Sequence, residues 1–162
     1  MSLATTDLCD AYGDDMRVVE PLFRDFGGRR HFAGLIYTLS VRDDNVIVRE
    51  MLEQPGDGRV LVVDGGGSLC CALLGDQLAT LAYKNGWSGI VVNGAVRDAE
   101  ALSTIDVGVK ALATCPRRSA KNGFGRRDLP VTFGGVTFAP GDWLAADTDG
   151  IVVADKSLAK PE

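Results

Sequence analysis

The sequence predicts a mixed α/β layered fold in which residues 1–162 form one domain. A length of 162 residues suits a single domain, because typical domains contain about 100–150 residues. In the middle of the chain, segments with helical spacing alternate with short continuous apolar runs, which are typical of strands buried on both faces. After residue 125 only short β segments follow. This combination favours an α/β layered architecture.

In the first half of the chain the sequence predicts a helix at 7–12, a strand at 32–41, a helix at 45–54 and a strand at 59–64. Thr5 and Thr6 are favourable N-cap residues for the first helix, and Gly13 ends it. The 32–41 segment is rich in β-branched and aromatic residues. The three glycines at 65–67 match no phosphate-binding fingerprint and are interpreted as a packing turn.

The second half is expected to contain a helix at 76–85 and strands at 89–93, 107–114, 131–133, 136–138, 143–146 and 151–153. Gly134 and Gly135 stand between two alternating apolar segments, which is a hairpin signal. The acidic segment at 147–150 lacks most ligands of a calcium loop and is interpreted as a turn. Residues 156–162 are expected to form a loose tail.

Charge and composition exclude several classes of function. The chain has 22 acidic and 17 basic residues, a net charge of −5, so we expect no direct nucleic-acid partner. No apolar stretch reaches the roughly 18 residues that cross a membrane, and no signal peptide is apparent, so we expect a cytoplasmic protein without a membrane partner. His31 is the only histidine, which argues against zinc and against Ser-His-Asp chemistry. The four cysteines form no C-x-x-C pair and are expected to be reduced.

The segment Gly75-Asp76-Gln77-Leu78 is a candidate anion-binding site, because it lies at the N-terminus of the predicted 76–85 helix. The first N–H groups of a helix lack intrahelical partners and lie at the positive end of its dipole, which suits a carboxylate or a phosphate. In the alternative interpretation Asp76 is only the N-cap of this helix, and the local sequence alone favours that alternative.

Arg97 and Asp98 form a second candidate, because they follow a buried strand and ligands gather at the carboxyl ends of strands in α/β folds. Arginine offers a permanently charged fork for a carboxylate or an enolate. Asp98 could hold Mg²⁺, which typically takes only one or two protein carboxylates. The alternative is that the pair merely opens the next helix, with Asp98 as its cap.

Seven segments together resemble the RraA-like family, which contains the regulators of ribonuclease activity A and the 4-hydroxy-4-methyl-2-oxoglutarate aldolases. They are residues 6–10, 19–21, 26–29, 34, 58–67, 94–97 and 133–136. The resemblance covers nearly the whole chain. It implies a swivelling β/β/α-type sandwich that assembles as a homotrimer, or as a hexamer of two paired trimers.

The family's enzymes carry a glycine, about twenty residues and then Arg-Asp, and here 21 residues separate Gly75 from Arg97. The resemblance implies that the 75–78 backbone binds the pyruvoyl carboxylate, that Arg97 binds the keto oxygen, and that Asp98 holds Mg²⁺ or Mn²⁺. A water on the metal or on Asp76 is the candidate base. The implied activity is class II aldol cleavage of 4-hydroxy-4-methyl-2-oxoglutarate to pyruvate, with decarboxylation of oxaloacetate, another small 2-oxo acid.

The alternative function is a non-catalytic regulator that binds ribonuclease E and inhibits it. The presence of the Arg-Asp pair favours catalysis, because family members that act chiefly as regulators need not keep it. An acidic protein is also suited to a basic partner, so the net charge of −5 is compatible with the regulator. The two functions can coexist on one scaffold.

Overall fold

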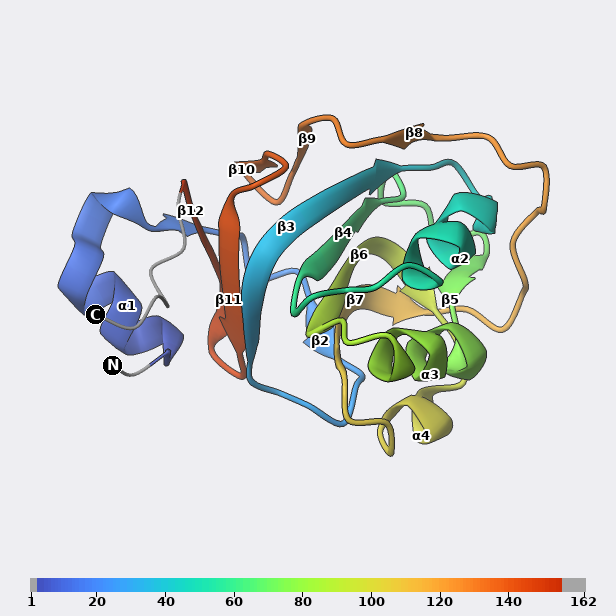
Figure 1. Ribbon diagram of the computed structural model, residues 1–162, viewed down its shortest axis with the longest axis horizontal. Helices are drawn as coiled ribbons and strands as arrows, with labels where there is room; N and C mark the ends of the chain where they lie inside the picture. The colour runs from blue at the N-terminus through green and yellow to red at the C-terminus, as the bar shows by residue number, and fades with distance from the viewer. Residues whose placement is uncertain (1–2, 156–162) are drawn as a thin grey trace.

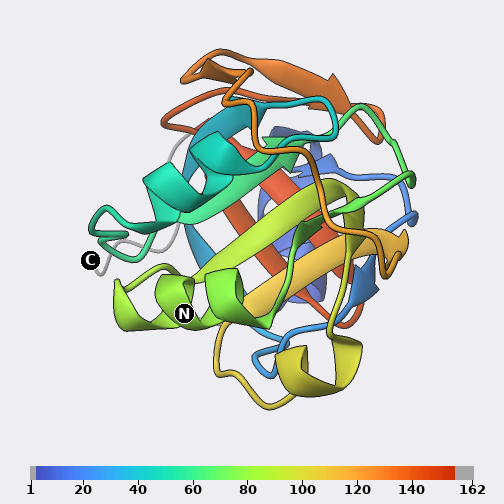
Figure 2. The same ribbon diagram turned by 90° about the vertical axis from the view of Figure 1, so that its right-hand side faces the viewer.

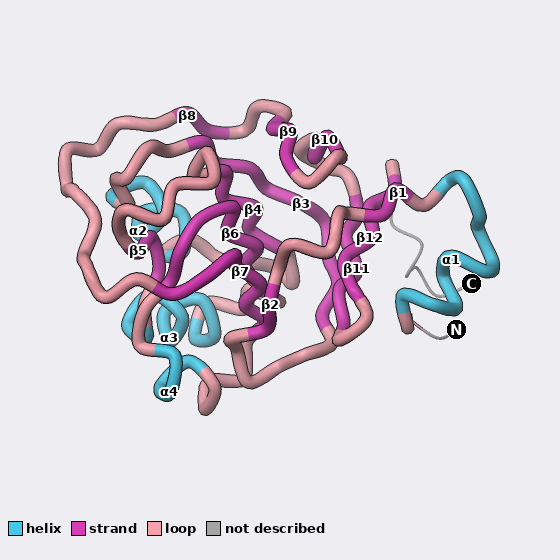
Figure 3. The backbone as a smooth tube through the Cα atoms, turned by 180° about the vertical axis from the view of Figure 1, so that it is seen from behind, coloured by secondary structure: helices cyan, strands magenta, loops and turns pink. Residues whose placement is uncertain are grey.

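The computed structural model of the protein describes residues 3–155, and its largest element is a curled ten-stranded sheet (Figure 1). The strand order is β1-β12-β11-β3-β4-β6-β7-β2, with β5 beside β6 and β8 beside β3. Strands β3, β4, β6 and β7 are mutually parallel, and β2 pairs antiparallel with β7 at one edge. Figure 3 shows β2 beside β7. The expected tail at 156–162 lies outside the described residues.

The helical elements are α1 (Thr5–Tyr12), the 3-10 turn η1 (Gly13–Asp15), α2 (Val46–Leu52), α3 (Asp76–Lys84) and α4 (Ala99–Leu102). The strands are β1 (Arg17–Val18), β2 (Arg24–Asp25), β3 (Phe32–Ser40), β4 (Val60–Asp64), β5 (Ala72–Leu74), β6 (Gly89–Val96), β7 (Gly108–Thr114), β8 (Arg126–Arg127), β9 (Val131–Phe133), β10 (Val136–Phe138), β11 (Trp143–Asp147) and β12 (Gly150–Ala154). None of the described helices is long and apolar enough to cross a bilayer.

The central strands are buried on both faces, as their continuous apolar runs predict. In β4, Leu61 and Val63 belong to the cluster beneath α2 and α3, whereas Val60 and Val62 belong to a second cluster on the opposite face. Successive side chains of a strand point to opposite faces, so a strand covered on both sides needs apolar residues at every position. Helices α2 and α3 cover one face of the parallel strands (Figure 2).

A second β layer covers the other face of the parallel strands. The sheet curls, so that β11 and β12, together with the β9–β10 hairpin, pack against this second face of the parallel strands (Figure 1). The rings of Phe133 and Phe138 stack at 4.4 Å within this layer. Helix α1 lies outside β11 and β12, where Leu8 packs with Trp143. The result is a β/β/α arrangement, which confirms the predicted fold class.

The predicted hairpin at Gly134-Gly135 is confirmed. Both glycines have positive φ, at 57° and 75°, and Phe133 pairs with Val136 across the turn. A two-residue loop with positive φ at both positions is the type I′ geometry that matches the twist of the flanking strands.

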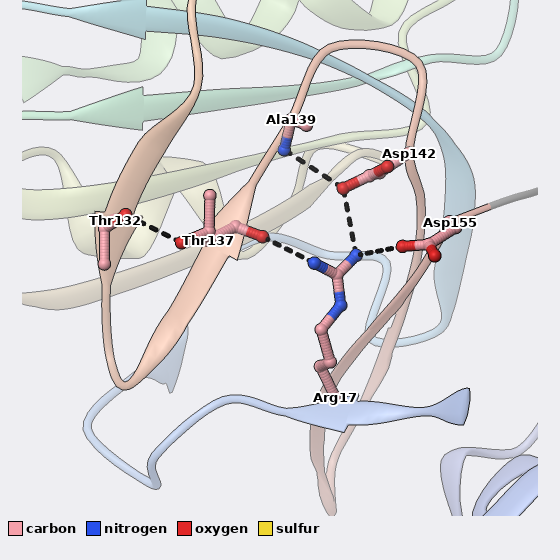
Figure 4. A network of polar contacts seen from close by, with 6 residues as sticks. All are labelled: Arg17, Thr132, Thr137, Ala139, Asp142 and Asp155. Atoms are coloured by element: carbon pink, nitrogen blue, oxygen red, sulfur yellow. Dashed lines mark hydrogen bonds and ion pairs between the residues drawn. The ribbon is translucent and has the colours of Figure 1, made fainter. Parts of the chain in front are cut away.

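Arg17 ties the N-terminal segment to the second β layer (Figure 4). Its guanidinium donates to the carbonyl oxygen of Thr137 at 3.0 Å and to the carboxylate of Asp142 at 2.9 Å. Asp155 contributes a further ion-pair contact at 3.3 Å. The Asp142 carboxylate also accepts the N–H of Ala139, so one arginine links β1, β10, the loop before β11 and the end of β12.

The predicted N-cap of α1 is wrong. The helix begins at Thr5, and Ala4 occupies the N-cap position without a side-chain hydrogen bond. Thr5 instead donates its N–H and its hydroxyl to the two carboxylate oxygens of Asp147, each at 2.7 Å. Asp147 begins the β11–β12 turn, which confirms the turn expected at 147–150. The helix is therefore capped from a residue 142 positions away.

Asp147 should contribute to the acid sensitivity of the fold. Burial raises the pKa of its carboxyl, but the N–H and hydroxyl of Thr5 and the N–H of Asp149 lower that pKa more, so the net direction is down. A lowered pKa in the folded state gives stability that is present above the ordinary value of about 3.9 and lost as the pH falls through the folded value. We expect Asp147→Asn to lower the free energy of unfolding at pH 7 by about 1–3 kcal/mol.

The measurement is urea unfolding at pH 7 and at pH 3.5. The mutant's deficit should shrink at the lower pH, because Asp147 of the unfolded wild-type chain, with its ordinary pKa of about 3.9, becomes protonated there, while the lowered pKa disfavours protonation in the folded state. Asp149→Asn is the matched control, since that side chain is exposed. Equal losses in the two variants would contradict the capping role.

Candidate functional site

Two parallel strands end side by side at the candidate site. Strand β5 leads directly into Gly75 and helix α3, and β6 leads directly into Arg97 and Asp98. Leu74 pairs with Val96, and the N–H of Arg97 donates to the carbonyl oxygen of Leu74 at 2.9 Å. This pairing brings together two segments that lie 21 residues apart. The prediction that Arg97 and Asp98 lie at the carboxyl end of a buried strand is confirmed.

Gly75 is required by the close approach of Asp98. A Cβ atom at Gly75 would lie 2.6 Å from the Oδ2 of Asp98 and 3.3 Å from the Cγ of Arg97. The same Oδ2 accepts the N–H of Asp76 at 3.1 Å. Asp98 itself has φ 62° and ψ 45°, a left-handed conformation that aspartate tolerates better than most residues. Any side chain at position 75 would push the carboxylate away from the helix.

The structure decides between the local alternatives for the two acidic residues. The N-cap of α3 is Gly75, and Asp76 makes no side-chain capping bond, so the interpretation of Asp76 as only an N-cap is wrong. Asp98 does occupy the N-cap position of α4, as that alternative held, but its carboxylate makes no capping bond to α4. It reaches the N-terminus of α3 instead.

The N-terminus of α3 presents backbone donors to the site. The N–H of Ala79 bonds to the carbonyl oxygen of Gly75 at 3.0 Å, so the N–H groups of Gln77 and Leu78 belong to the first turn. Groups in that turn have no intrahelical acceptor, and the helix dipole makes this end positive. The bond from Asp76 to Asp98 demonstrates that a carboxylate fits here.

All six residues predicted for the site line one cavity of about 370 Å³, a volume in the range of small-molecule sites. One side, the α3 wall, consists of Gly75, Asp76, Gln77, Leu78, Arg97 and Asp98. The facing residues, here called the loop wall, come from the start of α2 and from the β7–β8 loop, which Figure 1 shows in orange. They are Asn45, Arg49, Arg118, Ser119 and Lys121.

The sequence did not predict the loop wall. Its residues are scattered between positions 45 and 121, and the only signal was the basic pair Arg117-Arg118. The wall is assembled by Asp44, a buried carboxylate that accepts the N–H of Val46 at 3.0 Å and that of Asn122 at 2.6 Å. Burial raises the pKa of the Asp44 carboxyl, but these and neighbouring backbone N–H groups lower that pKa more, and the net direction is down. A charged Asp44 thus fastens the β7–β8 loop to α2.

The cavity concentrates positive charge. Arg49, Arg97, Arg118 and Lys121 line it together with only two carboxylates. Reduced hydration and the positive charges of Arg49, Arg97 and Arg118 lower the pKa of the Lys121 ammonium group, although Asp44 opposes them. The Nζ of Lys121 donates to the Oδ1 of Asn45 at 2.5 Å. Such a lining favours anionic ligands.

The residues present fit a hard divalent cation that takes most of its ligands from water and substrate. Asp98 uses one carboxylate oxygen for the N–H of Asp76, and its side chain is exposed to the cavity. Within residues 3–155 no group of three or more His, Cys, Asp or Glu side chains could enclose a metal. Mg²⁺ commonly binds through one or two protein carboxylates, so Asp98 alone, with substrate oxygens, suits it.

The family model for RraA-like proteins, described as Aldolase/RraA, matches residues 5–153. The chain belongs to the RraA-like family. A proposed 4-hydroxy-4-methyl-2-oxoglutarate aldolase of Alkalilimnicola ehrlichii is 60% identical over 160 residues, which cover 99% of both chains.

Two solved structures are similar to the chain over almost its full length. The RNA-processing inhibitor RraA from Thermus thermophilis is 47% identical with a TM-score of 0.93, covering 99% of this chain and 98% of that one. A Geobacillus kaustophilus protein described as an S-adenosylmethionine: 2-dimethylmenaquinone methyltransferase is 48% identical with a TM-score of 0.93, covering 98% and 99%. The predicted membership of the RraA-like family is confirmed.

Gly75→Ala should displace Asp98 while the backbone of α3 stays in place. The φ of Gly75 is −133°, which any residue adopts, so the conflict is only between the new methyl group and the Asp98 carboxylate. We expect faster amide hydrogen exchange at Asp76, because its acceptor moves away. Thr80→Ala, one turn further along α3, is the control. Unchanged exchange at Asp76 in Gly75→Ala would contradict the contact.

Proposed function

We propose that the chain is a divalent-metal-dependent, class II aldolase that cleaves 4-hydroxy-4-methyl-2-oxoglutarate into two molecules of pyruvate. The observation that carries the proposal is the convergence of Arg97 and Asp98 on the N-terminus of α3. A cationic fork, a reachable carboxylate and helix N–H groups in one cavity are what a metal-assisted reaction of a 2-oxo acid needs. The 60% identical relative bears the name of this activity.

In the proposed complex, the carboxylate at C1 of the substrate accepts hydrogen bonds from the N–H groups of Gln77 and Leu78. The positive end of α3 stabilises its charge. The guanidinium of Arg97 donates to the 2-oxo oxygen, where negative charge develops during the reaction. The backbone of Arg97 is held at the end of β6 by its bond to Leu74, which keeps the root of this side chain beside Gly75.

Cleavage breaks the bond between C3 and C4. The 4-hydroxyl gives its proton to a water positioned by Asp76, and C4 becomes the keto carbon of one pyruvate. The electron pair of the broken bond moves toward C3 and the 2-oxo oxygen as an enolate, which Arg97 stabilises. A proton returned to C3 gives the second pyruvate. Loss of carbon dioxide from oxaloacetate leaves the same enolate, so we propose that decarboxylation is a side activity.

Asp98 is the residue that would hold the cation, Mg²⁺ or Mn²⁺, which when bound acts as a Lewis acid on the 2-oxo group. The α3 wall contains no lysine, and Lys121, the one lysine among the described lining residues, lies on the loop wall with its Nζ bonded to Asn45. The methyltransferase name of the Geobacillus structure fits this cavity poorly. A lining with four cations and two carboxylates disfavours the positive sulfonium of S-adenosylmethionine.

We further propose that the chain assembles as a homotrimer, either alone or as a hexamer of two trimers. Exposed apolar side chains are available for such contacts, among them Phe124, which is 75% exposed, and Val18, which is 59% exposed.

Asp98→Ala and Arg97→Ala should each lower kcat/KM for pyruvate release at least about a hundredfold, because one removes the metal carboxylate and the other the donor to the developing oxyanion. Activity of the wild type should be lost with a chelator and restored by Mg²⁺ or Mn²⁺. The measurement is pyruvate release from 4-hydroxy-4-methyl-2-oxoglutarate and from oxaloacetate. Lys84→Ala, at the other end of α3, is the control. Activity that is independent of metal or unchanged in Asp98→Ala would refute the proposal.

A second candidate function is inhibition of ribonuclease E by direct binding. It is supported by the similarity to the Thermus RNA-processing inhibitor. If this function is separate from catalysis, Asp98→Ala should inhibit ribonuclease E as strongly as the wild type does. The measurement is cleavage of a labelled RNA by ribonuclease E at increasing concentrations of each variant. No inhibition by the wild type would dismiss this candidate.

A further inference from the structure

The loop wall contains a buried hydroxyl without a partner. Ser119 is 5% exposed, and within residues 3–155 its Oγ is the only buried side-chain nitrogen or oxygen that makes no hydrogen bond. Buried polar groups are almost always hydrogen-bonded, so an exception calls for a specific reason. Ser119 lines the cavity between Arg118 and Lys121. A group of a bound ligand is a sufficient partner for this hydroxyl.

The cations of the loop wall are not neutralised by ion pairs, although the buried Asp44 carboxylate acts on Lys121. Arg49, Arg118 and Lys121 form no ion pair with a carboxylate in the part of the chain that the structure describes. Their mutual repulsion contributes to the lowered pKa of the Lys121 ammonium group. Gathering like charges is unfavourable unless an anion offsets the repulsion. An anion in the cavity would do so.

The loop wall is fixed in place by hydrogen bonds at both of its ends. Asp44 accepts the N–H groups of Asn122 and Gly123 at 2.6 and 3.0 Å. The N–H of Ala120 donates to the carbonyl oxygen of Asp43 at 2.8 Å, and the N–H of Ala72 donates to that of Arg117 at 2.7 Å. These bonds flank Arg118 and Ser119, so the wall is organised before any ligand arrives, which favours binding.

We propose that the loop wall is a second carboxylate subsite, which binds the far carboxylate of a 2-oxo dicarboxylate whose first carboxylate lies on the α3 wall. The proposal rests on the proposed function for the position of that first carboxylate. Arg118 and Arg49 supply the forks that bind a carboxylate through paired hydrogen bonds. Ser119 supplies the remaining donor, and Lys121 adds charge. The site therefore selects 2-oxo acids with a carboxylate at each end.

The test compares two ligands that differ only at the far end. 2-Oxoglutarate has the five-carbon chain and both carboxylates but no 4-hydroxyl, so it cannot undergo the cleavage. 2-Oxopentanoate has a methyl group in place of the far carboxylate. Binding is measured by titration calorimetry on the full chain, with and without Mg²⁺. We expect the wild type to bind 2-oxoglutarate at least about tenfold more tightly than 2-oxopentanoate. Hydrogen bonds to a charged group are strong enough to produce a difference in affinity of that size.

Arg118→Ala should reduce this preference to less than about threefold, because it removes the fork that faces the far carboxylate. Arg117→Ala is the matched control, since Arg117 is the exposed neighbour and does not line the cavity. That variant should keep the wild-type preference. Equal affinity of the wild type for the two ligands, or an equal effect of the two arginine variants, would overturn the proposal.

Ser119→Ala separates ligand binding from a structural role. If the hydroxyl binds a ligand, its removal should leave the melting temperature of the free protein unchanged or higher. The affinity for 2-oxoglutarate should fall about tenfold. A lower melting temperature with unchanged affinity would assign Ser119 to the fold alone. Both arms measure binding, so they remain decisive if no pyruvate release is found. The absence of pyruvate release would refute the proposed aldolase activity. The carboxylate subsite would still be tested by the affinities for 2-oxoglutarate and 2-oxopentanoate.

Discussion

The short strand β5 is the element on which the rest of the site depends. Each of its three residues makes a hydrogen bond to a different part of the site. The N–H of Ala72 donates to Arg117 in the β7–β8 loop, at 2.7 Å. The carbonyl oxygen of Leu73 accepts the side-chain amide of Asn45, at 3.1 Å. The carbonyl oxygen of Leu74 accepts the N–H of Arg97, at 2.9 Å. All three β5 residues are buried, and their bonds tie both walls to the same short strand.

The parts of the fold with strong local patterns could be predicted from the sequence. The apolar runs that became β4 and β6 are long enough to identify as buried strands, and Gly134-Gly135 requires a turn. The end of β6 placed Arg97 and Asp98 at a strand terminus. Strand β5 could not be recognised, because three residues are too few to establish a period. Its existence follows from pairing with β6, which is a tertiary interaction.

The loop wall and the cap of α1 share a reason for escaping prediction. In each case a buried aspartate binds backbone or hydroxyl donors from a distant segment: Asp44 reaches Asn122 across 78 residues, and Asp147 reaches Thr5 across 142. Nothing near Thr5 in the sequence indicates that its cap is remote, and the turn at 147–150 looks complete without a partner. Local propensity describes the ends of these segments, whereas the buried carboxylates decide what those ends contact.

The acidic net charge and the cationic cavity are compatible because electrostatic effects in the site are local. The chain carries a net charge of −5, yet four cations and two carboxylates line the cavity. Charges on the exposed surface are screened within about 8 Å at physiological ionic strength, whereas charges inside a cleft are screened much less. The contact between Asp98 and the N–H of Asp76 shows the consequence. A carboxylate of the chain itself already lies at the N-terminus of α3, in a protein whose overall charge would repel it.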